Sequence, residues 1–221
     1  MSQWREEKKL VLEAAREMLG KGLVVGTSGN ISLRLPPRDN RALLAITPSS
    51  RHYGSLDVDD IQVVDFHGQA IEGALRPSME TGLHAGIYLA RPNVNAVIHT
   101  HSVYASAAAV AGLEIPPILD DQVAFLGGAI KLAVHALSGS REQVENVLAA
   151  LEDRSAVLLA NHGALATGRT MRDAFTAAEL IEKTARIFLL ARAAGAVNPL
   201  PPDAQRAARA IYDKLQGENL I

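Results

Sequence analysis

Cysteine is absent from this 221-residue sequence. Its absence excludes disulfide bonds, thiolate-ligated zinc and a cysteine nucleophile, so any metal site must use imidazole nitrogens and oxygen ligands. The sequence also lacks an excess of positive charge, because 22 Lys and Arg stand against 24 Asp and Glu, for a formal net charge of −2. No broad basic field is available to neutralise a phosphate backbone, and we therefore expect no nucleic-acid partner.

Long apolar runs are missing as well. No run of about 18 uninterrupted apolar residues occurs, which argues against a membrane span. The first nine residues carry charges of both signs and lack the apolar stretch of a signal peptide, so we expect a cytoplasmic protein. With 48% hydrophobic and 21% charged residues, the composition is that of an ordinary globular protein, and we expect a single domain over residues 1–221.

The apolar pattern predicts an α/β fold in which a mixed or mainly antiparallel sheet is covered by helices. Helical spacing of apolar residues predicts helices at 3–20, 78–90, 102–112, 141–151, 170–194 and 203–215. Short β-type runs predict strands at 31–35, 43–46, 61–66, 95–100, 130–134 and 156–159. The pair Gly127-Gly128 is expected to mark a bend or close approach in a strand region.

Three histidines follow predicted strands. His99 and His101 stand two residues apart at the end of the strand 95–100, and side chains two apart on a strand point to the same side. His162 follows the strand 156–159. Glu80 lies in the first turn of a predicted helix, where its carboxylate could be a ligand or a base. Taken singly, the histidines could equally be ordinary hydrogen-bonded side chains, and Glu80 could simply complement the helix dipole.

Taken together, three imidazoles and a carboxylate suit zinc or a similar divalent ion, with one coordination position open to substrate oxygens. Such an arrangement describes a catalytic site. Of the other histidines, His84 is expected on a helix face towards a neighbouring element, and His52, His67 and His135 in loops or on the surface.

Small and hydroxylated residues form a second group, at strand ends and at a helix start. Hydroxyls, backbone N–H groups and a helix N-terminus are what a phosphate monoester needs when no GxxxxGK[ST] sequence is present, as here. Each segment alone could be a tight turn. The segments are Gly26-Thr27-Ser28-Gly29-Asn30, Thr47-Pro48-Ser49-Ser50 and Ser78. A carboxylate pair, Asp120 and Asp121, could supply acid/base groups, a solvated turn or a partner for an arginine.

These segments together resemble the class II aldolase superfamily, which includes L-fuculose-phosphate aldolases, ribulose-phosphate 4-epimerases and the adducin head. The resemblance covers nearly the whole chain and is carried by the motifs at 26–30, 46–50, 77–80, 97–102 and 161–163, which stand in the family's order. It implies a three-layer α/β/α fold around a mostly antiparallel sheet. It also implies a homotetramer with active sites at subunit interfaces.

The same resemblance implies one divalent ion per subunit on His99, His101 and His162, most in keeping with zinc and also compatible with manganese or cobalt. Glu80 would be a ligand in the resting enzyme and the acid/base once substrate displaces it. The phosphate of the sugar substrate would be surrounded by Thr27, Gly29, Asn30, Ser49, Ser50 and Ser78. The reaction implied is cleavage of a ketose or deoxyketose 1-phosphate, similar to fuculose 1-phosphate, to dihydroxyacetone phosphate and an aldehyde.

Some positions depart from the family pattern. Met79 stands where the family aldolase has a second serine, and Ser50 replaces the usual glycine. Asp121 stands where the fuculose enzyme carries a tyrosine near the aldehyde, so the aldehyde half need not be lactaldehyde. Asp121 remains a candidate acid/base, as does Tyr212 in the tail, where the family places a tyrosine that reaches a neighbouring subunit's site.

Other branches of the superfamily are alternatives. A methylthioribulose-1-phosphate dehydratase also keeps three histidines and a nearby glutamate, whereas the sugar-phosphate 4-epimerases typically have aspartate where Glu80 stands. A decarboxylase of 3-oxo-acid phosphates is a further alternative. A non-catalytic module like the adducin head would lack the metal histidines, which this chain retains.

Overall fold

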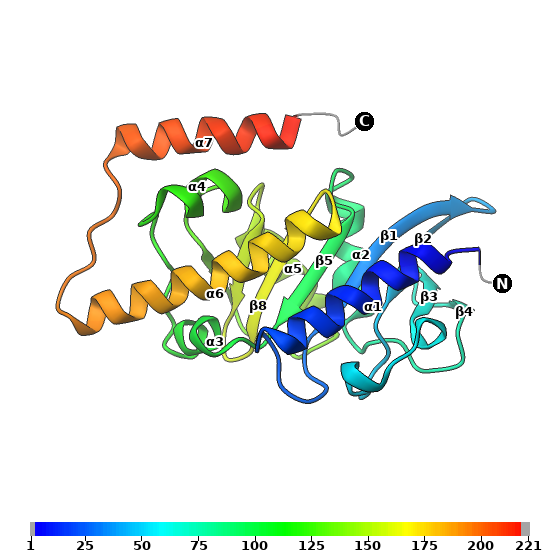
Figure 1. The fold of residues 1–221 in the computed structure, drawn as a ribbon. Helices are drawn as coiled ribbons and strands as arrows, with labels where there is room; N and C mark the ends of the chain where they lie inside the picture. The colour runs from blue at the N-terminus through cyan, green and yellow to red at the C-terminus, as the bar shows by residue number, and fades with distance from the viewer. Residues whose placement is uncertain (1–2, 218–221) are drawn as a thin grey trace.

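The computed structural model describes residues 3–217, in which eight strands form one sheet (Figure 1). The strand order is β4-β3-β2-β1-β5-β8-β7-β6, and every neighbouring pair is antiparallel except β6 and β7. The strands are β1 (Asn30–Arg38), β2 (Arg41–Ile46), β3 (Gln62–Asp65), β4 (Ala70–Glu72), β5 (Ala96–Thr100), β6 (Lys131–Ala133), β7 (Ala156–Leu159) and β8 (Gly163–Gly168). The prediction of a mostly antiparallel sheet is confirmed.

Helices cover both faces of this sheet. The helices are α1 (Arg5–Gly20), α2 (Thr81–Ala90), α3 (Val103–Val110), α4 (Asp120–Leu126), α5 (Arg141–Leu151), α6 (Met171–Ala193) and α7 (Pro202–Gly217), with short 3-10 turns η1 (Tyr53–Ser55) and η2 (Val58–Asp60). Helices α1, α3 and α6 pack on one face, and α1 and α6 cross the sheet in Figure 1. Helices α2 and α5 pack on the opposite face, which completes a three-layer α/β/α fold. Helix α7 lies against α4.

Alternation along the central strands decides which layer each side chain enters. In β5, Ala96 and Ile98 belong to the core under α1, α3 and α6, whereas Val97 belongs to the core under α2 and α5. This period of two is the ordinary geometry of a strand. His99 follows Ile98 and therefore points into the layer of α2 and α5.

Some elements differ from those predicted. The strands β4 and β8 and the helix α4 were not predicted, and α2 begins at Thr81 instead of residue 78. Strand β8 reads Gly-Ala-Leu-Ala-Thr-Gly, and such small residues have little β-propensity of their own. The expectation of a strand region at Gly127 was wrong. Gly127 follows α4 with φ +89°, a left-handed helix end that favours glycine because it has no Cβ.

Within residues 3–217, the helices are too short or too polar to cross a bilayer.

Gly163 allows the β5 and β8 backbones to meet closely, and its replacement is the first test of this fold. A Cβ at Gly163 would lie 2.3 Å from the Thr100 carbonyl oxygen. We expect Gly163→Ala to lower the free energy of unfolding by roughly 1–3 kcal/mol, because the two strands must separate. Gly82→Ala is the control, since nothing lies within 4 Å of that Cβ.

Gly82 is an exposed position of helix α2, where alanine should raise the free energy of unfolding by roughly 0.5–1 kcal/mol. Denaturant unfolding measures both variants. Equal stability of the two variants would contradict the close approach at Gly163.

Candidate active site

Three histidine side chains meet where β5 ends and β8 begins. His99 is the fourth residue of β5, His101 follows that strand, and His162 precedes β8, which pairs with β5. The Nε2 atom of His99 lies 2.9 Å from that of His101 and 3.2 Å from that of His162. The sheet thus brings together residues more than 60 positions apart in the sequence, as the motif analysis predicted.

The chemistry of these donors fits a divalent ion. His99 Nδ1 donates a hydrogen bond to the Ala164 carbonyl oxygen at 2.9 Å, so its Nε2 carries a lone pair. Burial lowers the pKa of both His101 and His162 to about 4, which keeps these rings neutral at neutral pH. Ligands of a tetrahedral zinc ion stand about 3.3 Å apart, given bonds of about 2.0–2.1 Å. The distances of 2.9 and 3.2 Å from His99 to the other two nitrogens are close to this spacing, and all three ligand atoms lie within 4.8 Å of one another.

Glu80 supplies a buried carboxylate beside the histidines. It is the residue before α2, is only 6% exposed, and places Oε2 3.3 Å from His99 Nε2 and Oε1 3.9 Å from His162 Nε2. Burial alone would raise the pKa of Glu80, but His99 and hydrogen bonds from Gln143 and Asn30 outweigh it and lower the pKa to about 2. The ionised carboxylate can act as a fourth oxygen ligand or as a base.

Two side-chain amides hold this carboxylate from opposite sides. Asn30 Nδ2 donates to Glu80 Oε2 at 2.8 Å, and Gln143 Nε2 donates to Oε1 at 2.7 Å. Because Asn30 donates through its nitrogen, its Oδ1 accepts from His84 Nε2 at 2.5 Å. The other ring nitrogen of His84 then accepts from Ser32 Oγ, at 2.7 Å. His84 therefore faces β1, as predicted for a helix residue packed on a neighbouring element.

Glycine is required where the chain enters β1. A Cβ at Gly29 would lie 2.5 Å from the His99 carbonyl oxygen, and the φ of Gly29 is +69°. Tyr53 donates its hydroxyl to the Gly29 carbonyl oxygen at 2.5 Å. Asn30 then pairs with His99 across β1 and β5. The segment 26–30 is thereby held against the histidine cluster.

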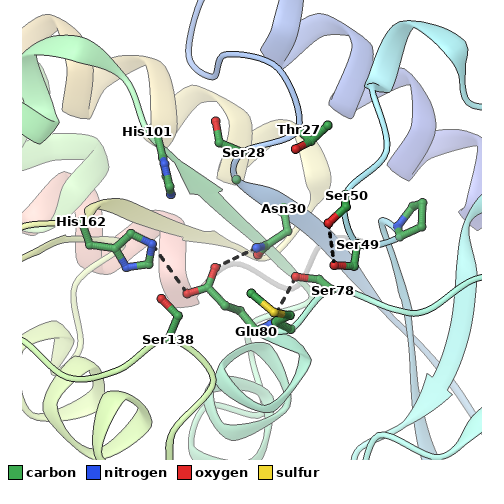
Figure 2. A pocket seen from close by; sticks show the side chains of 13 residues that line it. Thr27, Ser28, Asn30, Ser49, Ser50, Ser78, Glu80, His101, Ser138 and His162 are labelled. Atoms are coloured by element: carbon green, nitrogen blue, oxygen red, sulfur yellow. Dashed lines mark hydrogen bonds and ion pairs between the residues drawn. The ribbon is translucent and has the colours of Figure 1, made fainter.

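A cavity of about 300 Å³ opens above these groups. In Figure 2, Glu80 lies between two sides: Ser49, Ser50 and Ser78 on one, His101, His162 and Ser138 on the other. The residues that line the cavity are Thr27, Ser28, Gly29, Asn30, Pro48, Ser49, Ser50, Ser78, Met79, Glu80, His101, Ser138 and His162. All six residues expected around a phosphate are among them. The structure brings these six together beside the histidines; that they bind phosphate stays a prediction.

Ser50 and Ser78 show how the serines are placed. Ser50 has a φ of +56°, a left-handed conformation that favours glycine. Glycine is the residue that the family resemblance leads one to expect at this position. Ser78 Oγ accepts a hydrogen bond from the Glu80 backbone N–H at 3.2 Å, so one cavity hydroxyl also orders the turn that carries the carboxylate. Met79, which lies between Ser78 and Glu80 in the sequence, is 72% exposed.

Two predicted acid/base candidates lie elsewhere in the chain. Asp121 stands in the first turn of α4 and forms an ion pair with Lys183. Tyr212 is 1% exposed in α7, where its hydroxyl lies 2.9 Å from Ser155 Oγ and donates to the Asp153 carbonyl oxygen at 2.8 Å. Neither residue is among those that line the cavity of the described chain, and their roles in proton transfer stay predictions.

Two residues of the site were not predicted from the sequence. Ser138 lines the cavity, and Gln143 bonds to Glu80 from the first turn of α5. The stretch Ser138-Gly139-Ser140 before a predicted helix was visible as a helix start, since serine is a favoured N-cap. Nothing in that local signal connects it with Glu80, 63 residues earlier.

Comparisons with known proteins agree with this geometry. The family described as Class II Aldolase and Adducin N-terminal domain matches residues 9–189. A 5-deoxy-D-ribulose 1-phosphate aldolase of Bacillus thuringiensis serovar kurstaki is 34% identical over 199 residues, 90% of this chain and 92% of the relative. A 5-methylthioribulose-1-phosphate/5-deoxyribulose-1-phosphate aldolase of Rhodospirillum rubrum is 37% identical over 179 residues, 80% and 78% of the two chains. A solved L-fuculose 1-phosphate aldolase superposes with a TM-score of 0.88 at 31% identity, covering 96% of this chain and 98% of that one.

Replacing His99 or Glu80 tests the metal centre. His99→Ala should abolish retention of a divalent ion after dialysis, because it removes the central ligand of the cluster. Glu80→Gln should retain the ion with lower affinity, roughly 10–100-fold, since all three imidazoles remain. Metal content by elemental analysis and competition with a chromogenic chelator measure both. A His99→Ala protein that holds the ion as tightly as the wild type would disprove this centre.

Proposed function

Because this chain belongs to the family of class II aldolases and adducin N-terminal domains, we propose that it is a divalent-metal-dependent aldolase. Its substrate would be a ketose or deoxyketose 1-phosphate, cleaved to dihydroxyacetone phosphate and an aldehyde. The observation that carries the proposal is the ionised carboxylate of Glu80, next to three clustered imidazoles at the base of a hydroxyl-lined cavity. The two aldolase relatives named for 5-deoxyribulose phosphates make that sugar the first substrate to test.

The hydroxyl-rich side of the cavity would bind the phosphate. Ser49, Ser50 and Thr27 present hydroxyls without a positively charged side chain among the lining residues. Hydroxyls and backbone N–H groups can hold a phosphate dianion through several charge-assisted hydrogen bonds. This binding would anchor the ketose so that its C2 carbonyl and C3 hydroxyl reach the histidines.

His99, His101 and His162 would hold the ion, zinc being the one most in keeping with this donor set. The ion, when bound, supplies a positive charge that stabilises the negative charge developing on the substrate's oxygens as the C3–C4 bond breaks. An imidazole is uncharged as a metal ligand, so three histidines would leave the ion its full charge, whereas the one carboxylate can be displaced by substrate.

Glu80 would move the proton at C3. In the synthetic direction its carboxylate removes a proton from C3 of dihydroxyacetone phosphate. In the cleavage direction the C4 hydroxyl gives up its proton as C4 becomes the aldehyde carbon, and the electron pair of the broken C3–C4 bond remains at C3. One proton is then delivered to C3 through Glu80, so that the proton lost at C4 balances the proton gained at C3. The low pKa of Glu80 before substrate binds means that its carboxylate is ionised and able to accept a proton.

The proposal extends to a homotetramer with active sites at subunit interfaces, in the cytoplasm. Two exposed apolar side chains support a contact with another subunit beside the cavity. Met79, which lines the cavity, is 72% exposed, and Leu137, next to the cavity residue Ser138, is 76% exposed. Apolar side chains that form a contiguous exposed patch mark protein–protein contact surfaces.

A panel of sugar phosphates tests the reaction. Release of dihydroxyacetone phosphate should be seen with 5-deoxyribulose 1-phosphate, and its rates with ribulose 1-phosphate, fuculose 1-phosphate and methylthioribulose 1-phosphate should rank the aldehyde halves. A chelator should abolish release and added zinc should restore it, because the ion supplies the charge stabilisation. A coupled assay that oxidises NADH measures the product. No release from any of the four by protein with bound metal would refute the aldolase proposal and favour the dehydratase or decarboxylase branch.

Ser49→Ala tests the phosphate end. Loss of one hydrogen bond to a charged group costs roughly 1.5–3 kcal/mol, so KM should rise roughly 10–100-fold while kcat changes little. Inhibition by inorganic phosphate should weaken in the same proportion, which measures binding without the reaction. If Ser49→Ala altered neither KM nor inhibition, the phosphate would have to bind elsewhere.

A further inference from the structure

A buried amide on α5 reaches the carboxylate that the proposed reaction uses. Gln143 is the third residue of α5, is 3% exposed, and donates from Nε2 to Glu80 Oε1 at 2.7 Å. Most glutamines lie on the surface, and a buried one must find partners for its polar atoms. Its burial at this position therefore needs a reason beyond the packing of α5.

The orientation of this amide is determined by its other contacts. Gln143 Oε1 accepts a hydrogen bond from the Gly139 backbone N–H at 2.7 Å. A 180° rotation of the amide would place its oxygen against the Glu80 carboxylate, an acceptor against an acceptor. It would also place its nitrogen against the Gly139 N–H, a donor against a donor. The NH₂ group therefore has to face Glu80.

The loop before α5 is also fitted to the turn before Glu80. Gly139 has a φ of +79°, and a Cβ at this residue would lie 2.7 Å from the Met79 carbonyl oxygen. Gly139, which donates to the Gln143 amide, thus lies directly against the residue preceding Glu80. This close backbone contact and the Gln143–Glu80 hydrogen bond together fix the N-terminal end of α5 against that of α2.

The two oxygens of Glu80 have different support. Oε2 accepts a hydrogen bond from Asn30 Nδ2. Asn30 in turn accepts a hydrogen bond from His84 and pairs with His99 across β1 and β5. Oε1 accepts a hydrogen bond from Gln143 Nε2, the one side-chain amide bonded to this oxygen among residues 3–217. Without this donor, Oε1 would be a buried acceptor lacking that hydrogen bond, and the carboxylate would rotate or recruit water.

We propose that Gln143 is a positioning residue for the aldolase reaction. By holding Oε1, it keeps Oε2 of Glu80 aimed at the histidine cluster, where the carboxylate can meet the ion and the C3 proton. This inference rests on the proposed function, since it assigns Gln143 to the same site. Gln143 acts through Glu80 and touches no reacting atom itself.

Gln143→Leu removes the amide at similar side-chain size. We expect kcat to fall roughly 10–100-fold, the usual effect of removing a partner that orients a ligand or base, while KM changes less than about threefold. Gln143→Glu keeps the acceptor for the Gly139 N–H but replaces the donor with a second carboxylate, and it should lose at least as much kcat.

Ser140→Ala is the matched control. It removes the N-cap hydrogen bond to the Gln143 backbone and should lower the melting temperature of the protein, because helix α5 loses its cap. The Gln143 side chain keeps its bonds to Gly139 and Glu80 in this variant, so kcat should remain within about twofold of the wild type. A merely structural role for Gln143 would instead make kcat losses follow the melting temperature in both variants.

Cobalt(II)-loaded protein gives a readout that does not depend on turnover. The visible absorption of cobalt reports the ligand set, and it should change in Gln143→Leu but not in Ser140→Ala. In a Glu80→Gln background, Gln143→Leu should have no further effect on the spectrum, because the carboxylate it orients is gone.

The outcomes separate the two proposals. A cobalt spectrum that responds to Gln143→Leu in a protein without aldolase activity would show that Gln143 orients Glu80, but it would refute the proposed function and with it a role in the aldolase reaction. Full kcat and an unchanged spectrum in an active Gln143→Leu protein would overturn the positioning role and leave the proposed function standing. Equal losses from Gln143→Leu with and without Glu80 would also overturn the positioning role.

Discussion

The burial of one charge, the carboxylate of Glu80, is the constraint to which the rest of the structure responds. A carboxylate that is 6% exposed is costly unless donors or charges surround it. Its partners come from β1, β5 and α5, through Asn30, His99 and Gln143. All three lie at least 19 positions from Glu80 in the sequence, so the charge can be stabilised only once the sheet and the layer of α2 and α5 on it have assembled.

The order of the strands follows from this requirement as much as from the core. Strand β5 lies between β1 and β8, which places the amide of Asn30 on one side of His99 and the turn bearing His162 on the other. Gly29 and Gly163 lie where a Cβ would collide with the backbone of β5. Local backbone geometry and long-range charge pairing therefore favour the same arrangement, the consistency expected of a sequence with one native structure.

The sequence predicted those parts of the site whose signals are local. His99 and His101 share a strand face by simple alternation, and Glu80 and the serines belong to short motifs. Gln143 carries no such signal, because its partner is 63 positions away and its own neighbourhood reads as a helix cap. Strand β8 was missed for the same reason: its small residues form a strand because β5 and β7 flank it. The resemblance to a family supplied the fold, which periodicity alone left as a helix-covered sheet.

In the proposed reaction the two sides of the cavity would contribute in different ways. Hydroxyls around a phosphate bind substrate and transition state about equally, because the phosphate does not react, and they lower KM without raising kcat. Only groups whose interactions strengthen as the C3–C4 bond breaks can raise kcat, and in the proposed reaction those would be the histidine cluster and Glu80. The buried amides belong to that second side, since they cost nothing to reorganise during the reaction once the fold has placed them. The polar contacts that stabilise the Glu80 charge in the folded protein would thus be the same contacts that prepare it for proton transfer.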